Sequence, residues 1–137
     1  MAKLNAQEKK TFQHQFKVQQ ADIDELGHVN NVVYLRWVQD LAEAHWKNRA
    51  PSAVQKKYFW VVLRHEIDYL HPAFPGDAIS GLTWVEDFQG ARSNRIVQLY
   101  LQHTGQILAE AKTTWCLLEA ATMKPKRIDE DVVSVFG

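Results

Sequence analysis

The fold is decided by the stretch Asp22–Asn31, which reads DIDELGHVNN and runs directly into a helical repeat of apolar residues. Its acidic side chains, its glycine and its final asparagines are typical of a turn followed by a helix start. The first backbone N–H groups of a helix have no partner inside the helix, and the helix dipole favours negative charge there. A carboxylate beside such N–H groups could activate a nucleophile while they stabilise an oxyanion. The stretch therefore indicates an enzyme-like site.

One long helix is predicted from Asn31 to Asn48, because apolar residues recur there at helical spacing. Its apolar face carries Tyr34, Trp37, Val38, Leu41, Ala44 and His45. Pro51 prevents a simple continuation, and residues 51–57 are expected to add one short turn.

Strands are predicted over most of the remaining chain, because apolar and polar residues alternate there between turn residues. The expected strands are Thr11–Val18, Tyr58–Leu70, Ala78–Asp87, Arg95–Gln102 and Ile107–Leu118. The tail Thr122–Gly137 is polar at first and has a short apolar ending, for which no element is predicted. One amphipathic helix beside about five antiparallel strands predicts a single α+β domain, residues 1–137, whose sheet wraps around the helix.

Charge and composition exclude several classes of protein. The 16 basic and 16 acidic residues cancel, so nothing indicates binding to nucleic acid or to an anionic membrane. No apolar run approaches the roughly 20 residues that span a bilayer, and Met1–Lys10 does not resemble a signal sequence. The single cysteine, Cys116, excludes an intramolecular disulfide, fits a reducing compartment and is expected to be buried. We therefore expect a cytoplasmic protein.

The acidic stretch has two readings that need no catalysis. Asp22 and Asp24 could be turn or N-cap residues, and we expect Asp22 to be structural. Asp22, Asp24 and Gly27 also occupy the first, third and sixth positions of an EF-hand loop. However, Leu26 and Val33 stand where such a loop needs a ligand oxygen and a bidentate glutamate. No metal site is expected.

The pattern Asp22-x-Asp24-x-x-Gly27-His28-Val29-Asn30-Asn31-x-x-Tyr34 resembles the hydroxybenzoyl-CoA thioesterase-like branch of the hotdog-fold acyl-CoA thioesterases. Three later segments agree with the family in the same order: Ile67–Asp77, Gly105–Trp115 and Lys124–Ile128. The resemblance extends from about Phe12 to Glu130. One departure is Asp129, where related sequences often carry proline.

The resemblance implies a hotdog fold and a homodimer or homotetramer whose active site lies at the subunit interface. It assigns the catalytic carboxylate to Asp24, as nucleophile or as general base on water. It also assigns polarisation of the thioester carbonyl to the backbone N–H of Asn31, at the helix start. The substrate would be an acyl-CoA, and no cofactor is expected apart from the coenzyme A of the substrate.

Other candidate site residues have a structural alternative. His28 could orient the carboxylate or contact substrate, or it could bond loop carbonyls. Tyr34 could line the pocket or belong to the core. Arg92 and Ser93 sit where family members commonly contact coenzyme A phosphates, or they form a solvated turn.

Several further residues are expected to be structural. Arg64 and Arg95 lie on strands, where arginines usually pair with neighbours such as Glu66. His65 is expected on the same apolar strand face as Val61 and Leu63, as a hydrogen-bonded core residue. Trp37 and Trp46 are expected to serve packing rather than an acyl site.

Two other functions remain open at this stage. The first is a hotdog enoyl-thioester hydratase or dehydratase, because His71 and Phe74–Gly76 faintly resemble the histidine loop of the fatty-acid dehydratases. The second is a non-catalytic acyl-binding module in which Asp24 is only a cap. The acyl group, and the choice between coenzyme A and acyl carrier protein, are not readable from the sequence.

Overall fold

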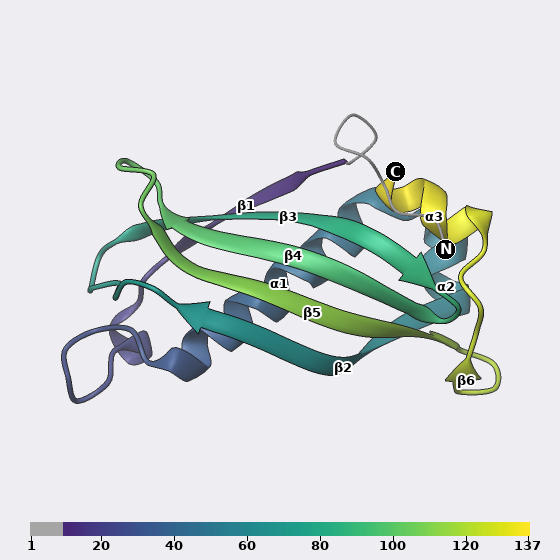
Figure 1. The fold of residues 1–137 in the computed structure, drawn as a ribbon, viewed down its shortest axis with the longest axis horizontal. Helices are drawn as coiled ribbons and strands as arrows, with labels where there is room; N and C mark the ends of the chain where they lie inside the picture. Colours follow the sequence, from purple (N-terminus) through teal and green to yellow (C-terminus); the bar gives the residue numbers. More distant parts are fainter. Residues whose placement is uncertain (1–9) are drawn as a thin grey trace.

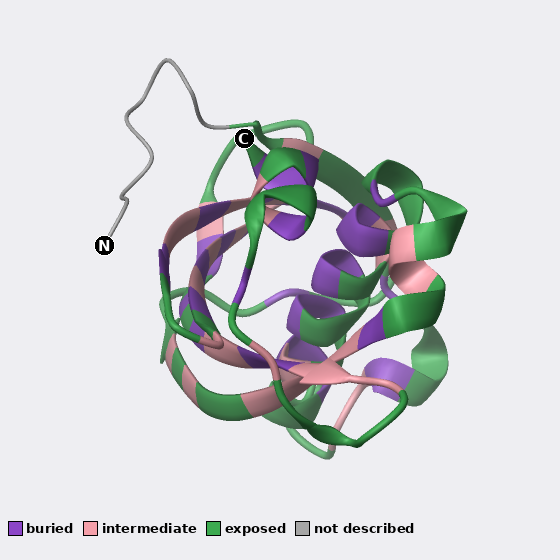
Figure 2. Ribbon diagram, turned by 90° about the vertical axis from the view of Figure 1, so that its right-hand side faces the viewer, coloured by how far each residue is buried: buried purple, intermediate pink, exposed green. Residues whose placement is uncertain are grey.

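A long helix, α1 (Asn31–Arg49), lies in the concave face of a curled antiparallel sheet in the computed structural model, which describes residues 10–137 (Figures 1 and 2). The strands are β1 (Phe12–Lys17), β2 (Tyr58–Tyr69), β3 (Ala78–Gln89), β4 (Arg92–Leu101), β5 (Ile107–Glu119) and the short β6 (Lys124–Pro125). The sheet has the order β1-β3-β4-β5-β2, and β6 pairs with β5. The other helical segments are η1 (Gln20–Asp22), α2 (Ser52–Lys57) and α3 (Glu130–Phe136). The predicted α+β architecture, with a sheet wrapped around one long helix, is confirmed.

The bounds of α1 follow from its sequence. Asn30 is the N-cap, and its side-chain Oδ1 accepts a hydrogen bond from the backbone N–H of Val32 at 3.0 Å. The helix ends at Arg49, just before Ala50 and Pro51, where a proline ring cannot continue the helical backbone. The predicted end was one residue earlier. The short turn predicted after Pro51 is α2.

The core forms where the apolar face of α1 meets the sheet. Leu41 is fully buried at the middle of this face. Gly81 on β3 faces it so closely that a Cβ atom at this position would lie 2.9 Å from Cδ2 of Leu41. The absence of a side chain at residue 81 therefore lets the helix approach the sheet. Among residues 10–137, no helix combines the length and the apolar character needed to cross a membrane.

One sequence prediction about the sheet is wrong, and the tail contains a helix that the sequence analysis did not predict. A β-bulge in β2 at Leu63 shifts the register with β5, so Leu63 is 48% exposed instead of sharing the inner face with His65. The inner face of the first half of β2 carries Tyr58 and Trp60, which pack in a core cluster. The tail, for which no element was predicted, contains α3, and Phe136 at its end is buried.

Candidate active site

The loop that leads into α1 is held by its own backbone. The N–H of Asp24 donates to the carbonyl of His28 at 3.0 Å, and the N–H of Gly27 donates to the carbonyl of Asp24 at 3.1 Å. Gly27 has a φ of 83°, a conformation that glycine adopts without steric cost. Ile23 and Val29 form an isolated antiparallel bridge across the base of the loop. These contacts hold residues 24–28 as a tight turn beside the helix start.

Asp22 is the buried anchor of this loop, as the sequence predicted. Its Oδ2 accepts from the backbone N–H of Gln19 at 2.8 Å, and its Oδ1 accepts from Nη2 of Arg36 at 2.8 Å. Its carbonyl oxygen accepts from the N–H of Asn30 at 2.9 Å, which ties the loop to the N-cap of α1. Because every one of these contacts is structural, Asp22 is not a free carboxylate for chemistry.

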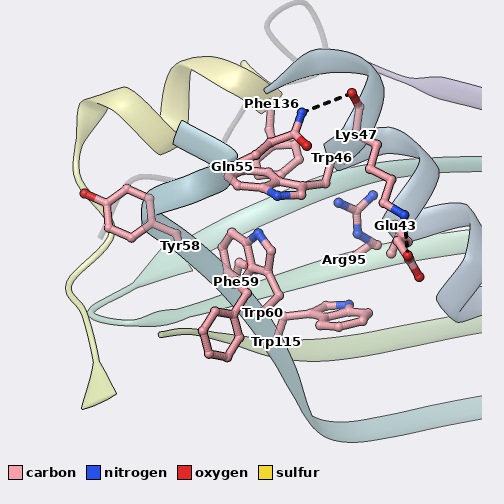
Figure 3. Close-up of a pocket in the computed structure, with 12 residues that line it drawn as sticks. Glu43, Trp46, Lys47, Gln55, Tyr58, Phe59, Trp60, Arg95, Trp115 and Phe136 are labelled. Atoms are coloured by element: carbon pink, nitrogen blue, oxygen red, sulfur yellow. Dashed lines mark hydrogen bonds and ion pairs between the residues drawn. The ribbon is translucent and has the colours of Figure 1, made fainter. Parts of the chain in front are cut away.

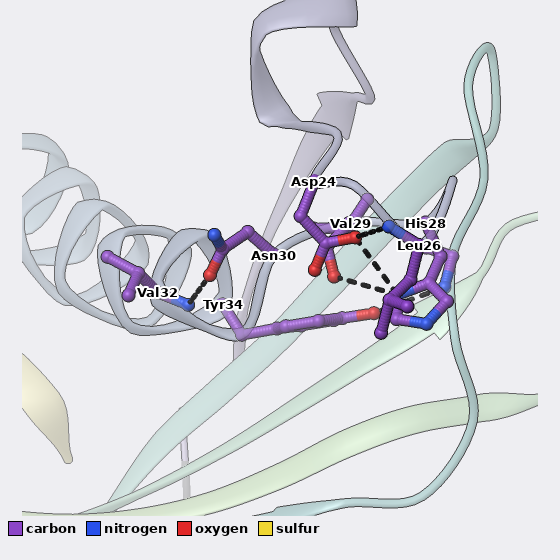
Figure 4. A network of polar contacts seen from close by, with 8 residues as sticks. Asp24, Leu26, His28, Val29, Asn30, Val32 and Tyr34 are labelled. Carbon is purple, nitrogen blue, oxygen red and sulfur yellow. Dashed lines mark hydrogen bonds and ion pairs between the residues drawn. The ribbon is translucent and has the colours of Figure 1, made fainter.

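Asp24, in contrast, keeps part of its carboxylate unbound (Figure 4). Its side chain is 26% exposed. Oδ1 accepts from the N–H of Leu26 at 2.9 Å and lies 3.9 Å from Nδ1 of His28. Among residues 10–137, Oδ2 has no hydrogen-bond partner. The loop therefore orients the carboxylate through one oxygen and leaves the other for a substrate or a water molecule.

The start of α1 presents one backbone donor next to this loop. The side-chain oxygen of Asn30 accepts a hydrogen bond from the N–H of Val32, and its carbonyl oxygen accepts one from the N–H of Val33. The N–H of Asn31 has no acceptor among the described residues, and Asn31 is exposed. An unpaired N–H in the first turn of a 19-residue helix, where the dipole is positive, suits a developing oxyanion.

A small cleft of about 140 Å³ adjoins the helix start. Its lining residues are His28, Val29, Asn31, Tyr34, Tyr69, Leu70, His71 and Pro72. Asp24 is not among them; it borders the cleft through its 3.9 Å contact with His28. The structure thus brings Asp24, His28, Asn31 and Tyr34 together at one end of the sheet.

Tyr34 has a structural as well as a lining role. It is buried, and its hydroxyl oxygen accepts from the backbone N–H of Ala73 at 3.1 Å. Burial raises the pKa of Tyr34 above its usual value, so the hydroxyl keeps its proton at neutral pH. Tyr34 therefore fixes the chain after β2 and forms one wall of the cleft.

Arg92 and Ser93 do not join this group in one chain. They begin β4, opposite Cys116 and Trp115 of β5. The cleft is lined by Tyr69, the last residue of β2, and the ribbon shows the end of β2 and the start of β4 at opposite ends of the sheet (Figure 1). Ser93 is buried and lines a second cavity, whereas Arg92 is exposed.

The sequence predicts that Arg64 and Arg95 pair with neighbouring carboxylates. Arg64 does pair with Glu66, at 3.0 Å, but the prediction is wrong for Arg95. Arg95 is 4% exposed and has no carboxylate partner among residues 10–137. Its Nη1 donates to Nδ1 of His45 at 2.9 Å and to Oγ1 of Thr83 at 3.0 Å. Strand alternation could have revealed its position, because Arg95 shares a face with the buried Val97.

The other residues expected to be structural agree with the sequence interpretation. His65 contacts Oγ1 of Thr113 at 2.9 Å through Nδ1, and Cys116 is buried. Trp37 belongs to the core cluster. Trp46 is also buried, but it lines the same second cavity as Ser93.

His45 makes stability depend on pH. Burial, together with the charges of Arg95 and Arg49, lowers its pKa from 6.5 to about 3. Between these values the unfolded chain binds more protons than the folded one, so stability is full above pH 6.5 and falls as the pH drops toward 3. We expect the free energy of unfolding in urea to fall by on the order of a few kcal/mol across this window.

The control for this pH dependence is a pair of histidine variants. His45→Phe should flatten the slope between pH 6.5 and 4, whereas His103→Phe, at an exposed turn, should leave it unchanged. An unaltered slope in His45→Phe would contradict the prediction.

A long helix inside a curled antiparallel sheet, with a carboxylate loop at the helix start, is the architecture of the hotdog thioesterases. The sequence model of the thioesterase-like superfamily matches residues 18–136, and the chain belongs to this superfamily. This confirms the resemblance stated from sequence and the expected class, a thioester hydrolase.

Solved structures agree in fold. The 1,4-dihydroxy-2-naphthoyl-CoA thioesterase Slr0204 from Synechocystis is similar with a TM-score of 0.80 at 18% identity, covering 92% of this chain and 95% of that one. The probable thioesterase YbaW from Escherichia coli is similar with a TM-score of 0.77 at 24% identity, covering 90% and 94%.

Curated relatives agree in sequence over different lengths. The long-chain acyl-CoA thioesterase FadM from Escherichia coli is 25% identical over 125 residues, which are 88% of this chain and 92% of FadM. The chloroplastic acyl-[acyl-carrier-protein] hydrolase FATB3 from Cuphea viscosissima is 26% identical over 84 residues. These residues are 61% of this chain but only 20% of FATB3.

Proposed function

We propose that the protein hydrolyses an acyl-CoA thioester to a free acid and coenzyme A, with Asp24 as the catalytic carboxylate. The observation that carries the proposal is that two unbound groups occur where the loop enters α1, one in the loop and one at the first residue of the helix. These are Oδ2 of Asp24 and the backbone N–H of Asn31. A coenzyme A substrate is supported by the similarity to FadM, a long-chain acyl-CoA thioesterase. The match covers most of both chains.

Thioester hydrolysis needs a nucleophile and a donor for the developing oxyanion. In one route Asp24 attacks the carbonyl carbon and forms an anhydride as the thiolate leaves, and water then hydrolyses the anhydride to the free acid and the restored carboxylate. In the other route Asp24 takes a proton from a water molecule that attacks the carbonyl carbon, and the thiolate leaves. In both routes the N–H of Asn31 receives the carbonyl oxygen, and such a donor typically contributes about 3–4 kcal/mol of transition-state stabilisation. No cofactor enters either route.

His28 and Tyr34 are assigned supporting roles. His28 lies within 3.9 Å of the Asp24 carboxylate and lines the cleft, so it can orient the carboxylate or contact the substrate. Tyr34 forms the wall of the cleft under the helix start. Arg92 is assigned to the phosphates of coenzyme A, for which an exposed guanidinium is suited, and Ser93 adjoins it.

A homodimer, alone or paired into a tetramer, would complete this site. In one chain Arg92 and Asp24 lie toward opposite ends of the sheet. Strand β2 is at the edge of the sheet and exposes Leu63 and Tyr69. Antiparallel pairing of two β2 edges about a two-fold axis would place the beginning of one β2 near the end of the other. It would thereby bring Arg92 of one copy toward Asp24 of the other.

The oligomeric state is measured directly. We expect light scattering after gel filtration to give at least twice the 15.8 kDa mass of one chain. A monomer with full thioesterase activity at every concentration would contradict the shared site.

Release of free thiol from a panel of short, medium, long and aromatic acyl-CoAs tests the proposed reaction, with Asp24→Asn as the control variant. Hydrolysis that depends on residue 24 supports the proposal, and no release from any member rejects it. Because His71 lines the same cleft, the panel includes an enoyl-CoA, whose hydration without thiol release would indicate a hydratase instead. Acyl carrier protein thioesters are assayed in parallel, and a cytoplasmic location stays a prediction.

A further inference from the structure

A cavity of about 360 Å³ lies between the second half of α1 and the sheet (Figure 3). Half of its lining residues are aromatic: Trp46, Tyr58, Phe59, Trp60, Trp115 and Phe136. Trp46 is roughly 22 Å further along α1 than Asn31, at about 1.5 Å per helical residue. Within one chain the cavity is therefore separate from the Asp24 cleft.

A buried cation without a counter-ion faces this cavity. Arg95 lines it and bonds only to His45 and Thr83 among the described residues. Both partners are neutral, because the pKa of His45 is lowered to about 3. Burial lowers the pKa of Arg95 to about 9, so the guanidinium still carries its charge at neutral pH. A buried charge that lacks a partner is costly, and an anion in the cavity would relieve that cost.

Two buried indole donors point to the same kind of ligand. Nε1 of Trp60 and Nε1 of Trp115 are shielded from solvent and have no acceptor among residues 10–137. Figure 3 shows both indole nitrogens turned toward the space beside the Arg95 guanidinium. Buried N–H groups nearly always have an acceptor in folded proteins. The cavity thus has a buried cation and two unsatisfied donors among its lining residues.

The acidic group at the cavity does not supply the missing counter-ion. Glu43, the only acid among the lining residues that the structure describes, pairs with Lys47 at 2.7 Å. Both side chains are more than half exposed, so the pair lies at the rim. It leaves the interior positive.

We propose that this cavity binds a small aromatic carboxylic acid. The carboxylate would accept hydrogen bonds from Arg95, Trp60 and Trp115, and the ring would lie between the aromatic walls. A flat guanidinium matches a carboxylate in shape, and its single charge matches one carboxylate better than a phosphate dianion. The volume is near the lower end of the roughly 300–1,000 Å³ of ligand sites, which suits a free acid rather than a whole coenzyme A ester.

Calorimetry with naphthoate, and with uncharged naphthamide as the matched control, tests the charge requirement on the full chain. We expect naphthoate to bind at least about tenfold more tightly than naphthamide, because a hydrogen bond to an ionised acceptor is much stronger than one to a neutral acceptor. In proton–nitrogen correlation spectra, the indole signals of Trp60 and Trp115 should move on binding, whereas that of Trp37 in the other core cluster should not. Equal binding of acid and amide, or no binding of either, overturns the proposal.

Three variants locate the ligand. Arg95→Gln should weaken naphthoate binding by about tenfold or more, and the matched Arg127→Gln at an exposed position should not. Trp60→Phe keeps an aromatic side chain in the cavity wall but removes one hydrogen-bond donor. If Arg95→Gln does not fold, this variant tests whether naphthoate binds in the cavity. Unchanged affinity in Trp60→Phe together with unmoved Trp115 signals would refute the site, as would displacement of naphthoate by equimolar inorganic phosphate.

The test does not depend on hydrolysis. Asp24→Asn should bind naphthoate as the unmodified chain does, because Asp24 does not line the cavity of its own chain. In the proposed dimer, the change to asparagine also keeps nearly the same side-chain size, so the cavity of the other copy should keep its shape. Loss of binding in Asp24→Asn would contradict a separate site. The inference can therefore fail while the proposed thioesterase activity stands, and the reverse also holds.

Discussion

Replacing Asp24 by asparagine should lower thioester hydrolysis by about 10²–10⁴-fold, the usual contribution of a positioned general base or nucleophile. Asparagine keeps an oxygen that can accept from the N–H of Leu26, so the loop should keep its shape. What is lost is the negative charge and the basicity of the second oxygen. The measurement is kcat/KM for thiol release from the best acyl-CoA of the panel, with circular dichroism to show that the fold is retained.

Glu25→Gln is the matched control for this variant. Glu25 adjoins Asp24 but is exposed, so the same change from acid to amide should leave the rate within about twofold, as expected of a surface substitution. Full turnover by Asp24→Asn would move the chemistry to another group. Single-turnover hydrolysis in isotopically labelled water then separates the two routes. Label in Asp24 indicates the anhydride, because water can introduce it there only by opening that intermediate at the Asp24 carbonyl carbon.

The site loop and the central helix were predictable because they rest on local chemistry. Asparagine, found at residue 30, is among the favoured N-cap residues, and glycine at residue 27 permits the turn. Strand bounds were also found within a few residues, since alternation and turn residues are local signals. The separation of Asp22 as anchor from Asp24 as unbound carboxylate agrees with the sequence interpretation.

The second cavity was not predictable because it depends on contacts between distant segments. Arg95 was expected to pair with a carboxylate, as strand arginines usually do, but its partners are His45 from α1 and Thr83 from β3. The bulge at Leu63 changes which residues of β2 face inward. No single residue in the sequence predicts the position of this bulge. The helix at the end of the chain is too short for a helical period to stand out.

Phe136 is the largest buried side chain of that short helix, beside the smaller Val132 and Val135. Its ring lies 5.1 Å from the ring of His45 and 5.8 Å from that of Trp46, between ring centroids. The guanidinium carbon of Arg95 is 5.4 Å from its centroid, a cation–π geometry. Phe136 is 2% exposed, so it closes the core cluster at the C-terminal end of α1.

Phe136→Ala should therefore destabilise the protein by about 3–5 kcal/mol, the usual cost of deleting a buried phenylalanine ring. For a chain of 137 residues this corresponds to a fall in Tm of about 10–17 °C, measured by calorimetry. Phe74→Ala is the matched control, because Phe74 is 49% exposed and its loss should cost less than about 1 kcal/mol. Equal losses in the two variants would mean that α3 does not hold its place against α1 in solution. The second cavity, which Phe136 lines, would then lose one of its walls.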